Sequence, residues 1–134
     1  MNKQQAYNAF WGSFGVLAFE ENSVPDDRTI QALIASGAAQ SKYPYITYQV
    51  LTDDLGNTVY PTASIYDKST SWETADLLAN TISTRIQAMG TIKLDHGRMF
   101  ITKGSPFSQH FGDDSDDTIK RIVLNIGVEF LTEI

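Results

Sequence analysis

Apolar residues recur at every second position near the end of the sequence, and this pattern predicts a sheet with one covered face. The run TIKRIVLNIGVEFL carries them at Ile122, Leu124, Ile126, Val128 and Phe130. Successive side chains of a β-strand point to opposite faces of the sheet, so a period of two places all five on one face. We therefore expect a long final strand whose apolar face is covered by the core.

A long helix at about residues 70–89 is expected to pack on the sheet. Its apolar residues recur at intervals of three and four, which aligns them along one side of an α-helix. They are Trp72, Ala75, Leu78, Ala79, Ile82, Ile86 and Met89. Thr70 and Glu73 have the spacing of a capping box, which predicts the start of the helix, and Gly90 predicts its end.

Two short helices are predicted near the N-terminus. The aromatic residues of YNAFWGSF follow helical spacing, and that helix is expected to end near Gly15. A second helix is expected from about Asp26, because acidic side chains suit the positive end of the helix dipole, and Gly37 predicts its end.

Three further segments have the composition of strands. YPYITYQVLT and TVYPTASIY are rich in aromatic and β-branched residues and flank the turn-like DDLGN. Pro61 cannot donate a ladder hydrogen bond, so the second of these strands is expected to lie at an edge or to be interrupted there. TIKLD and RMFITK, on either side of His96 and Gly97, predict a hairpin.

Helices and strands do not alternate regularly in this order, which favours an α+β fold. We predict a mainly antiparallel mixed sheet with the long helix of about residues 70–89 packed across it and short N-terminal helices. The length of 134 residues fits a single domain, residues 1–134, that can bury a hydrophobic core.

Composition and charge exclude several classes of function. The net charge is −6 and the ten basic residues are scattered, which disfavours sequence-independent nucleic-acid binding. The sequence contains no cysteine, which excludes disulfides and thiolate metal sites. The apolar runs are too short to span a bilayer, and no leader pattern predicts secretion.

The segment GDDSDD concentrates four carboxylates, at Asp113, Asp114, Asp116 and Asp117. A calcium loop needs a glycine at its sixth position and a glutamate at its twelfth, and no register of this segment provides them. We therefore interpret it as a solvated loop, with a metal-dependent enzyme that uses these carboxylates as the alternative from another class of protein.

No catalytic, cofactor or metal site is predicted elsewhere, and we expect that the protein is not an enzyme. His96 and His110 are interpreted as loop residues without a catalytic role, because no nucleophile motif surrounds them. Phe107 and Phe111 flank SQH in a segment expected to be a polar loop. Aromatic residues beside an acidic segment are typical of an assembly surface, so Phe107, Phe111 and the four aspartates are its candidate residues.

Several segments in order resemble the tail terminator, or tail completion, proteins of long-tailed bacteriophages and prophages. They are AFEENSVPDD at Ala18–Asp27, YPYITYQV at Tyr43–Val50, ETADLLANTI after Trp72, KGSPF at Lys103–Phe107 and DDTIKRIVLNIGVEFL at Asp116–Leu131. No single motif is diagnostic, and their co-occurrence carries the resemblance. In the family pattern SVPDD leads almost directly into PYITY, whereas residues 28–42 intervene here as a helical insert.

The resemblance implies a structural virion protein with an α+β fold and no cofactor. Such proteins form a ring, typically a hexamer, on the head-proximal end of the tail tube, where they stop tube polymerisation and provide the surface that joins the head. The implied partners are further copies of the chain, the major tail tube protein and a neck or head-completion protein. Genome DNA would pass through the lumen without specific binding, and no membrane is involved.

The implied location is the virion tail, assembled in the cytoplasm of the host bacterium. Two further alternatives remain open. One is another head–tail connector or neck protein, and the other is a small adaptor that binds a partner through its aromatic segment.

Overall fold

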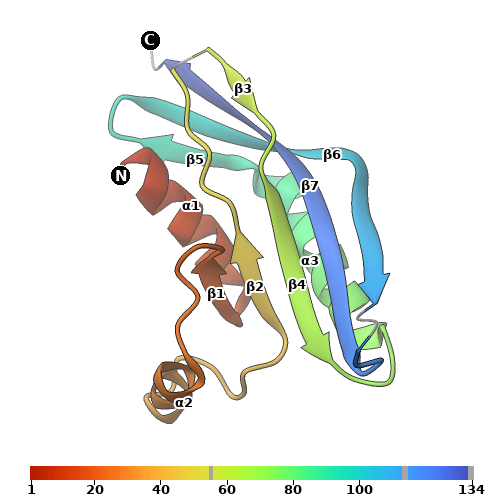
Figure 1. Ribbon diagram of the computed structural model, residues 1–134. Helices are drawn as coiled ribbons and strands as arrows, with labels where there is room; N and C mark the ends of the chain where they lie inside the picture. Colours follow the sequence, from red (N-terminus) through yellow and green to blue (C-terminus); the bar gives the residue numbers. More distant parts are fainter. Residues whose placement is uncertain (55, 113–114, 133–134) are drawn as a thin grey trace.

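The computed structural model describes residues 1–54, 56–112 and 115–132. Its strands are β1 (Leu17–Glu20), β2 (Tyr45–Tyr48), β3 (Thr58–Val59), β4 (Thr62–Lys68), β5 (Thr91–Leu94), β6 (Gly97–Gly112) and β7 (Ile119–Thr132). Its helices are α1 (Lys3–Trp11), the 3-10 turn η1 (Gly12–Phe14), α2 (Asp27–Ala35) and α3 (Glu73–Met89). The predicted α+β class is therefore confirmed (Figure 1).

The strands form one mixed sheet in the order β1-β2-β4-β7-β6-β5, with β3 paired to β7 beyond the end of β4. Only the β1–β2 pair is parallel, and every other pair in the described part of the chain is antiparallel. β7 lies between β4 and β6 near the middle of the sheet, although it follows every other strand in the sequence (Figure 1).

The helices α1 and α3 lie on the same face of the sheet, and the core lies between them and the strands. The predicted apolar face of β7 is confirmed, because its five alternating residues are at most 2% exposed. Of the helices in residues 1–54, 56–112 and 115–132, none covers the opposite face over β4, β7 and β6 (Figure 1). We call this second surface the open face of the sheet.

The structure corrects the predicted start of α3. Thr70 and Glu73 do not form a capping box; instead the Ser71 hydroxyl accepts a hydrogen bond from the Glu73 N–H at 3.1 Å. Five residues of the predicted stripe are buried, namely Ala75, Leu78, Ala79, Ile82 and Ile86. Met89 at the C-terminal end is 71% exposed, because the helix ends there beyond the edge of the core.

The other predicted elements occur close to their expected positions. The helical stripe of the first segment is continued as the 3-10 turn η1 up to Phe14. Asp26 caps α2 by accepting a hydrogen bond from the Thr29 N–H, and Gly37 follows the helix with a left-handed φ of 88°. Residues 60 and 61 separate β3 from β4, so the predicted interruption at Pro61 is confirmed.

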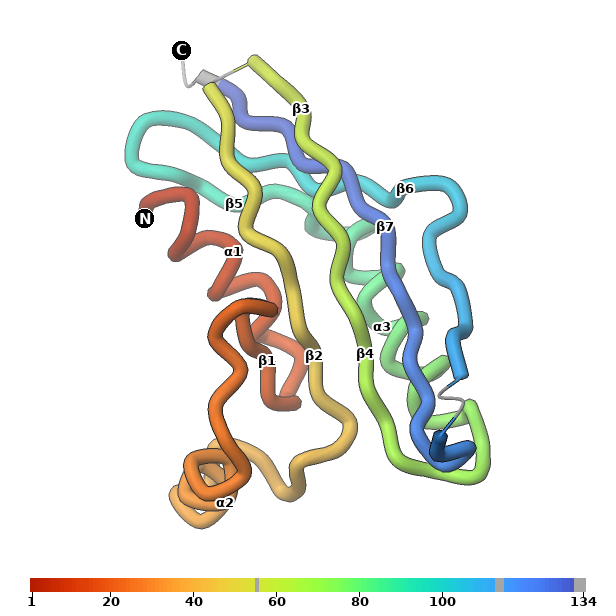
Figure 2. The backbone as a smooth tube through the Cα atoms, in the orientation of Figure 1, coloured from red at the N-terminus to blue at the C-terminus, as the bar shows by residue number. Residues whose placement is uncertain are grey.

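Two strand predictions were incomplete. The four-residue strand β1 was missed, because it is too short to show a period. The prediction of a loop around Phe107, His110 and Phe111 was wrong, because these residues belong to β6, which continues to Gly112. The backbone tube in Figure 2 follows β6 through a sharp bend and then down the side of β7.

Candidate assembly surface

The candidate surface residues before the acidic segment lie on the distal half of β6, which we define as residues 104–112. β5 pairs only with residues 97–100 of β6. In the described part of the chain, residues 104–112 have β7 as a strand neighbour on one side and no strand on the other. The distal half is therefore an open edge of the sheet, whose outward main-chain groups are available for pairing.

A bulge separates the two halves of β6. Lys103 lies opposite Ile126 and Ser108 lies opposite Leu124, so five steps of β6 (108 − 103) cover two steps of β7 (126 − 124). The Asn125 side-chain amide donates a hydrogen bond of 3.0 Å to the Pro106 carbonyl and so ties the bulge to β7. Bulges of this kind bend a strand and redirect its side chains.

The two candidate phenylalanines have different surroundings. Phe107 lies in the bulge, is half-buried against the main core, and has the Lys103 ammonium 5.9 Å from the centre of its ring. Phe111 is 46% exposed and lies opposite Arg121 of β7, on the open face. Of the two, Phe111 is the residue whose ring is available to a partner.

The acidic segment is only partly described. Asp113 and Asp114 lie outside the described residues. One carboxylate oxygen of Asp116 accepts hydrogen bonds from the Thr118 N–H at 2.9 Å and from the Thr118 hydroxyl at 2.6 Å. These bonds stabilise the carboxylate form and lower the pKa of Asp116. Asp117 is exposed, and its main-chain carbonyl accepts a hydrogen bond from the Lys120 ammonium.

His110 connects the distal half of β6 to the start of α3, where no contact was predicted. Its ring stacks on the Trp72 ring with 3.8 Å between centres and 3° between planes. Its Nε2 lies 2.6 Å from a carboxylate oxygen of Asp76, one turn further along α3. His110 is therefore a strand residue that contacts a helix, and we call this set of three residues the Trp72–His110–Asp76 clasp.

Two more charged residues lie near the clasp on the strands. The Lys120 ammonium lies 5.5 Å from the centre of the Trp72 ring. Asp67 of β4 lies directly opposite Lys120 of β7 in the strand register, and its side chain is only 5% exposed. One Asp67 carboxylate oxygen is buried and has no hydrogen-bond partner in the described part of the chain. A buried carboxylate oxygen without a partner is costly to desolvate.

A histidine beside an aspartate can act as a general base, so the surroundings of His110 decide whether the clasp could be catalytic. His110 and Asp76 are both close to half-exposed, and the His110 ring is covered on one face by Trp72. Within the described residues, no serine, threonine or tyrosine hydroxyl bonds to His110, and no three acidic or histidine side chains converge as a metal site. The arrangement fits a structural contact between β6 and α3.

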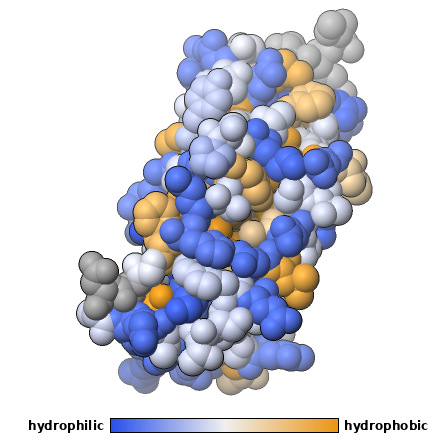
Figure 3. All heavy atoms as spheres, turned by 90° about the vertical axis from the view of Figure 1, so that its right-hand side faces the viewer, coloured by the Kyte–Doolittle hydropathy of each residue, from blue (hydrophilic) through white to orange (hydrophobic). Residues whose placement is uncertain are grey.

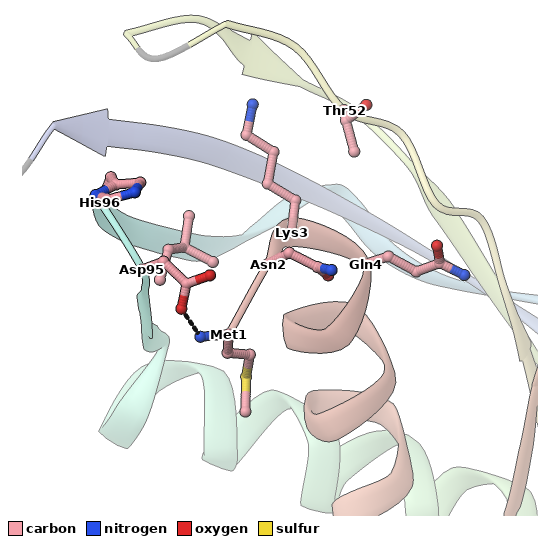
Figure 4. Close-up of a pocket in the computed structure, with 8 residues that line it drawn as sticks. Met1, Asn2, Lys3, Gln4, Thr52, Asp95 and His96 are labelled. Carbon is pink, nitrogen blue, oxygen red and sulfur yellow. Dashed lines mark hydrogen bonds and ion pairs between the residues drawn. The ribbon is translucent and has the colours of Figure 1, made fainter.

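A separate hollow of about 540 Å³ lies beside the start of α1 and the β5–β6 turn (Figure 4). Its charged groups are already paired: the Met1 ammonium contacts the Asp95 carboxylate, and the Lys3 ammonium donates to the Asp53 carbonyl. The contact with the ammonium lowers the pKa of Asp95. His96 also lines the hollow and directly follows Asp95 in the sequence.

The sequence contained no clear signal for the distal half of β6. Ser108, Gln109 and His110 are consecutive polar residues, so this segment lacks the alternation that predicts a strand. The preceding Gly104 and Pro106 have a composition typical of a loop. The contact between His110 and Trp72 spans 38 positions (110 − 72) and has no local signal.

None of the helices in the described part of the chain combines the length and the apolar character that crossing a membrane requires. Comparisons of the sequence with protein-family models and with curated proteins found no match.

Proposed function

We propose that the protein is a tail terminator that forms a ring on the head-proximal end of a phage tail tube. The observation that carries this proposal is the resemblance of five segments, in order, between Ala18 and Leu131. In this role the protein stops tube polymerisation and presents the surface that joins the head. It acts by assembly and uses neither a cofactor nor a metal.

The architecture is compatible with a ring. Closed rings of identical subunits need two unlike surfaces on each subunit, which meet head to tail. The sheet supplies two unlike edges, β1 on one side and the distal half of β6 on the other. The half-exposed Phe111 and the acidic segment lie at the second of these edges or directly follow it.

The charge is compatible with a passage for DNA. At a net charge of −6 the protein has little general attraction for phosphates, so a genome would pass through the lumen without being held. The proposed partners are further copies of the chain, the major tail tube protein and a neck or head-completion protein. The proposed location is the virion tail.

The experiment mixes the purified protein with isolated tail tubes and, separately, with tailless heads, and records electron micrographs of both. A tail terminator decorates one end of the tubes and prevents their elongation when free tube subunits are added. Decoration of heads alone would instead identify a neck protein. Binding to neither particle would overturn the proposal.

The role of the acidic segment is tested in the same assay. If the segment faces the tube, the quadruple substitution of Asp113, Asp114, Asp116 and Asp117 to Asn should abolish the salt dependence of tube binding. Unchanged binding by this variant would exclude the segment from the tube interface and leave the ring proposal intact.

A further inference from the structure

We propose that copies of the chain join through their sheets: β1 of one copy pairs antiparallel with the distal half of β6 of the next, and Phe111 enters a hollow beside β1. This inference deepens the ring-forming role proposed above and rests on it. The partner is a second copy of the same chain.

The two edges that would meet are both open. Among the described residues, β1 is the terminal strand on its side of the sheet and pairs with β2 alone. On the other side, residues 108–112 of β6 pair with β7 alone in this part of the chain, and residues 104–107 form the bulge. Open edges carry unpaired main-chain donors and acceptors, and the addition of a strand satisfies them. Figure 3 views the molecule from the β6 side, where hydrophobic and hydrophilic side chains are interspersed.

The strand directions suit such a pairing. β1 is parallel to β2, and the antiparallel pairs β2–β4, β4–β7 and β7–β6 then make β1 antiparallel to β6. Rotation about an axis roughly parallel to the strands keeps these directions. β1 of the next copy therefore reaches β6 in the antiparallel sense that continues the sheet.

The residues of the two edges also lie at matching positions along the strands. Direct cross-strand partners form a row from Leu17 through Tyr45, Tyr66 and Arg121 to Phe111. The next row on the same face runs from Phe19 to Gln109. A continuation of the sheet without stagger thus places Leu17 of one copy beside Phe111 of its neighbour.

A hollow at the β1 edge can receive the Phe111 ring. It has a volume of about 590 Å³, and its lining combines Val16, Ala38, Ala39, Tyr43 and Pro44 with the polar residues Gln40 and Ser41 and two glycines. The Tyr43 ring lies 5.5 Å from the ring of Tyr45, which shares the row and the face of Phe111. A half-exposed aromatic ring on one surface and a pocket on the other are typical of an interface anchor.

The charges are complementary at the Lys103 end of the proposed interface. Glu20 and Glu21 lie at the end of β1. Residues 101–112 of β6 contain no acidic residue and carry Lys103. In the antiparallel arrangement, the glutamates of one copy lie toward the Lys103 end of the neighbouring strand. Opposite charges across an interface favour this register over the reverse one.

The absence of cysteine permits a direct test by disulfide cross-linking. Phe19→Cys and Gln109→Cys are prepared as separate single variants and mixed under oxidising conditions, both in solution at high concentration and on tail tubes. The proposed pairing brings these positions within the distance that a disulfide spans, so the mixture should form covalent dimers. Either variant alone should form few.

A matched control mixes Phe19→Cys with Thr81→Cys, which lies on the exposed side of α3. The proposal is overturned if the first mixture cross-links no more than this control in both conditions. It is also overturned if Gln109→Cys alone cross-links efficiently, because that result indicates β6–β6 pairing.

A second test does not depend on cross-linking. Phe111→Asp should raise the concentration needed for self-association by at least about tenfold, because a charge replaces the anchoring ring. Leu77→Asp, at a residue of α3 that is 65% exposed, should leave self-association unchanged. Equal effects of the two substitutions, measured by analytical ultracentrifugation, would contradict the proposal.

The outcomes separate this inference from the proposed function. Rings on tail tubes without the cross-link between the Phe19→Cys and Gln109→Cys variants would overturn the edge pairing and retain the tail terminator. Efficient cross-linking by a protein that binds neither tubes nor heads would retain the edge pairing and overturn the phage role.

Discussion

The two halves of β6 belong to one strand but have different surroundings. Residues 97–100 have β5 on one side and β7 on the other, and Met99 is completely buried. Within the part of the chain that the structure describes, residues 104–112 have β7 as their one neighbouring strand, and Phe111 is 46% exposed. The first half therefore contributes to stability through burial, whereas the second contributes an edge and a side chain available to a partner.

The distal half is nevertheless fixed to the rest of the molecule. Asn125 holds the bulge, and the Trp72–His110–Asp76 clasp joins the strand to the start of α3. An edge held in this way loses little conformational entropy when a partner binds, which favours association.

The largest loss of stability should come from a substitution in residues 97–100, the buried half of β6. Met99→Ala removes a side chain that is 0% exposed and should lower the free energy of unfolding by about 2–5 kcal/mol. Phe111→Ala in the distal half should change it by less than about 0.5 kcal/mol in the monomer. Urea denaturation of both variants measures the difference, and similar losses would show that the two halves contribute equally.

The bulge between the halves should be sensitive to a single methyl group. A Cβ on Gly104 would lie 2.9 Å from the main-chain oxygen of Asn125, so Gly104→Ala should destabilise the protein by roughly 1–3 kcal/mol. At Gly112, the last residue of the same strand, a Cβ would meet no atom within 4 Å. Gly112→Ala is thus the matched control, and an equal loss at both positions would argue against a tight bulge.

The clasp should stabilise the protein by a smaller amount, which a double-mutant cycle can measure as an interaction energy between its residues. A double-mutant cycle of Trp72→Ala and His110→Ala should yield an interaction energy of about 0.5–1.5 kcal/mol, because stacked rings contribute that amount beyond buried area. The effects of Trp72→Ala and Phe111→Ala should be additive. Phe111 lies on the open face of the sheet, whereas Trp72 contacts His110 on the face that the helices cover. Additivity in the first cycle would show that the Trp72–His110 stacking does not stabilise the protein.

The smallest expected effect is the pH dependence that Asp116 contributes. Its pKa is lowered in the folded protein by its bonds to Thr118. The stabilisation is therefore present above the unfolded-state pKa of about 3.9 and is lost as the pH falls through the lower folded-state pKa. Asp116→Asn should be less stable than the wild type at neutral pH, and this difference should shrink below about pH 4. Denaturation curves over that range measure it, and a difference independent of pH would contradict the assignment.

The sequence predicted the elements with strong periods and missed those that depend on distant contacts. The period of two in β7 and the helical stripe of α3 each report a covered face, and both were found. The distal half of β6 was missed because Gly104 and Pro106 resemble a loop, whereas the bulge places them within a strand. The clasp needs Trp72 and His110 to be brought together by the whole fold.

The same limit applies to the candidate surface. Composition selected Phe107 and Phe111 together. Only the structure shows that Phe107 is half-buried against the core, whereas the Phe111 ring is available to a partner. The edge at β1 was not predicted, because the four residues of that strand are too few to show alternation.

The central position of β7 has a consequence for folding during synthesis. The ribosome produces β7 after every strand with which it pairs, namely β3, β4 and β6. Until β7 emerges, β4 lacks one neighbouring strand, and the distal half of β6 lacks the one strand that lies beside it among the described residues. Contacts distant in sequence form slowly, so the sheet should close only after β7 has been made. The proposed binding edge would then be complete only in fully folded subunits, and unfinished chains would be excluded from assembly.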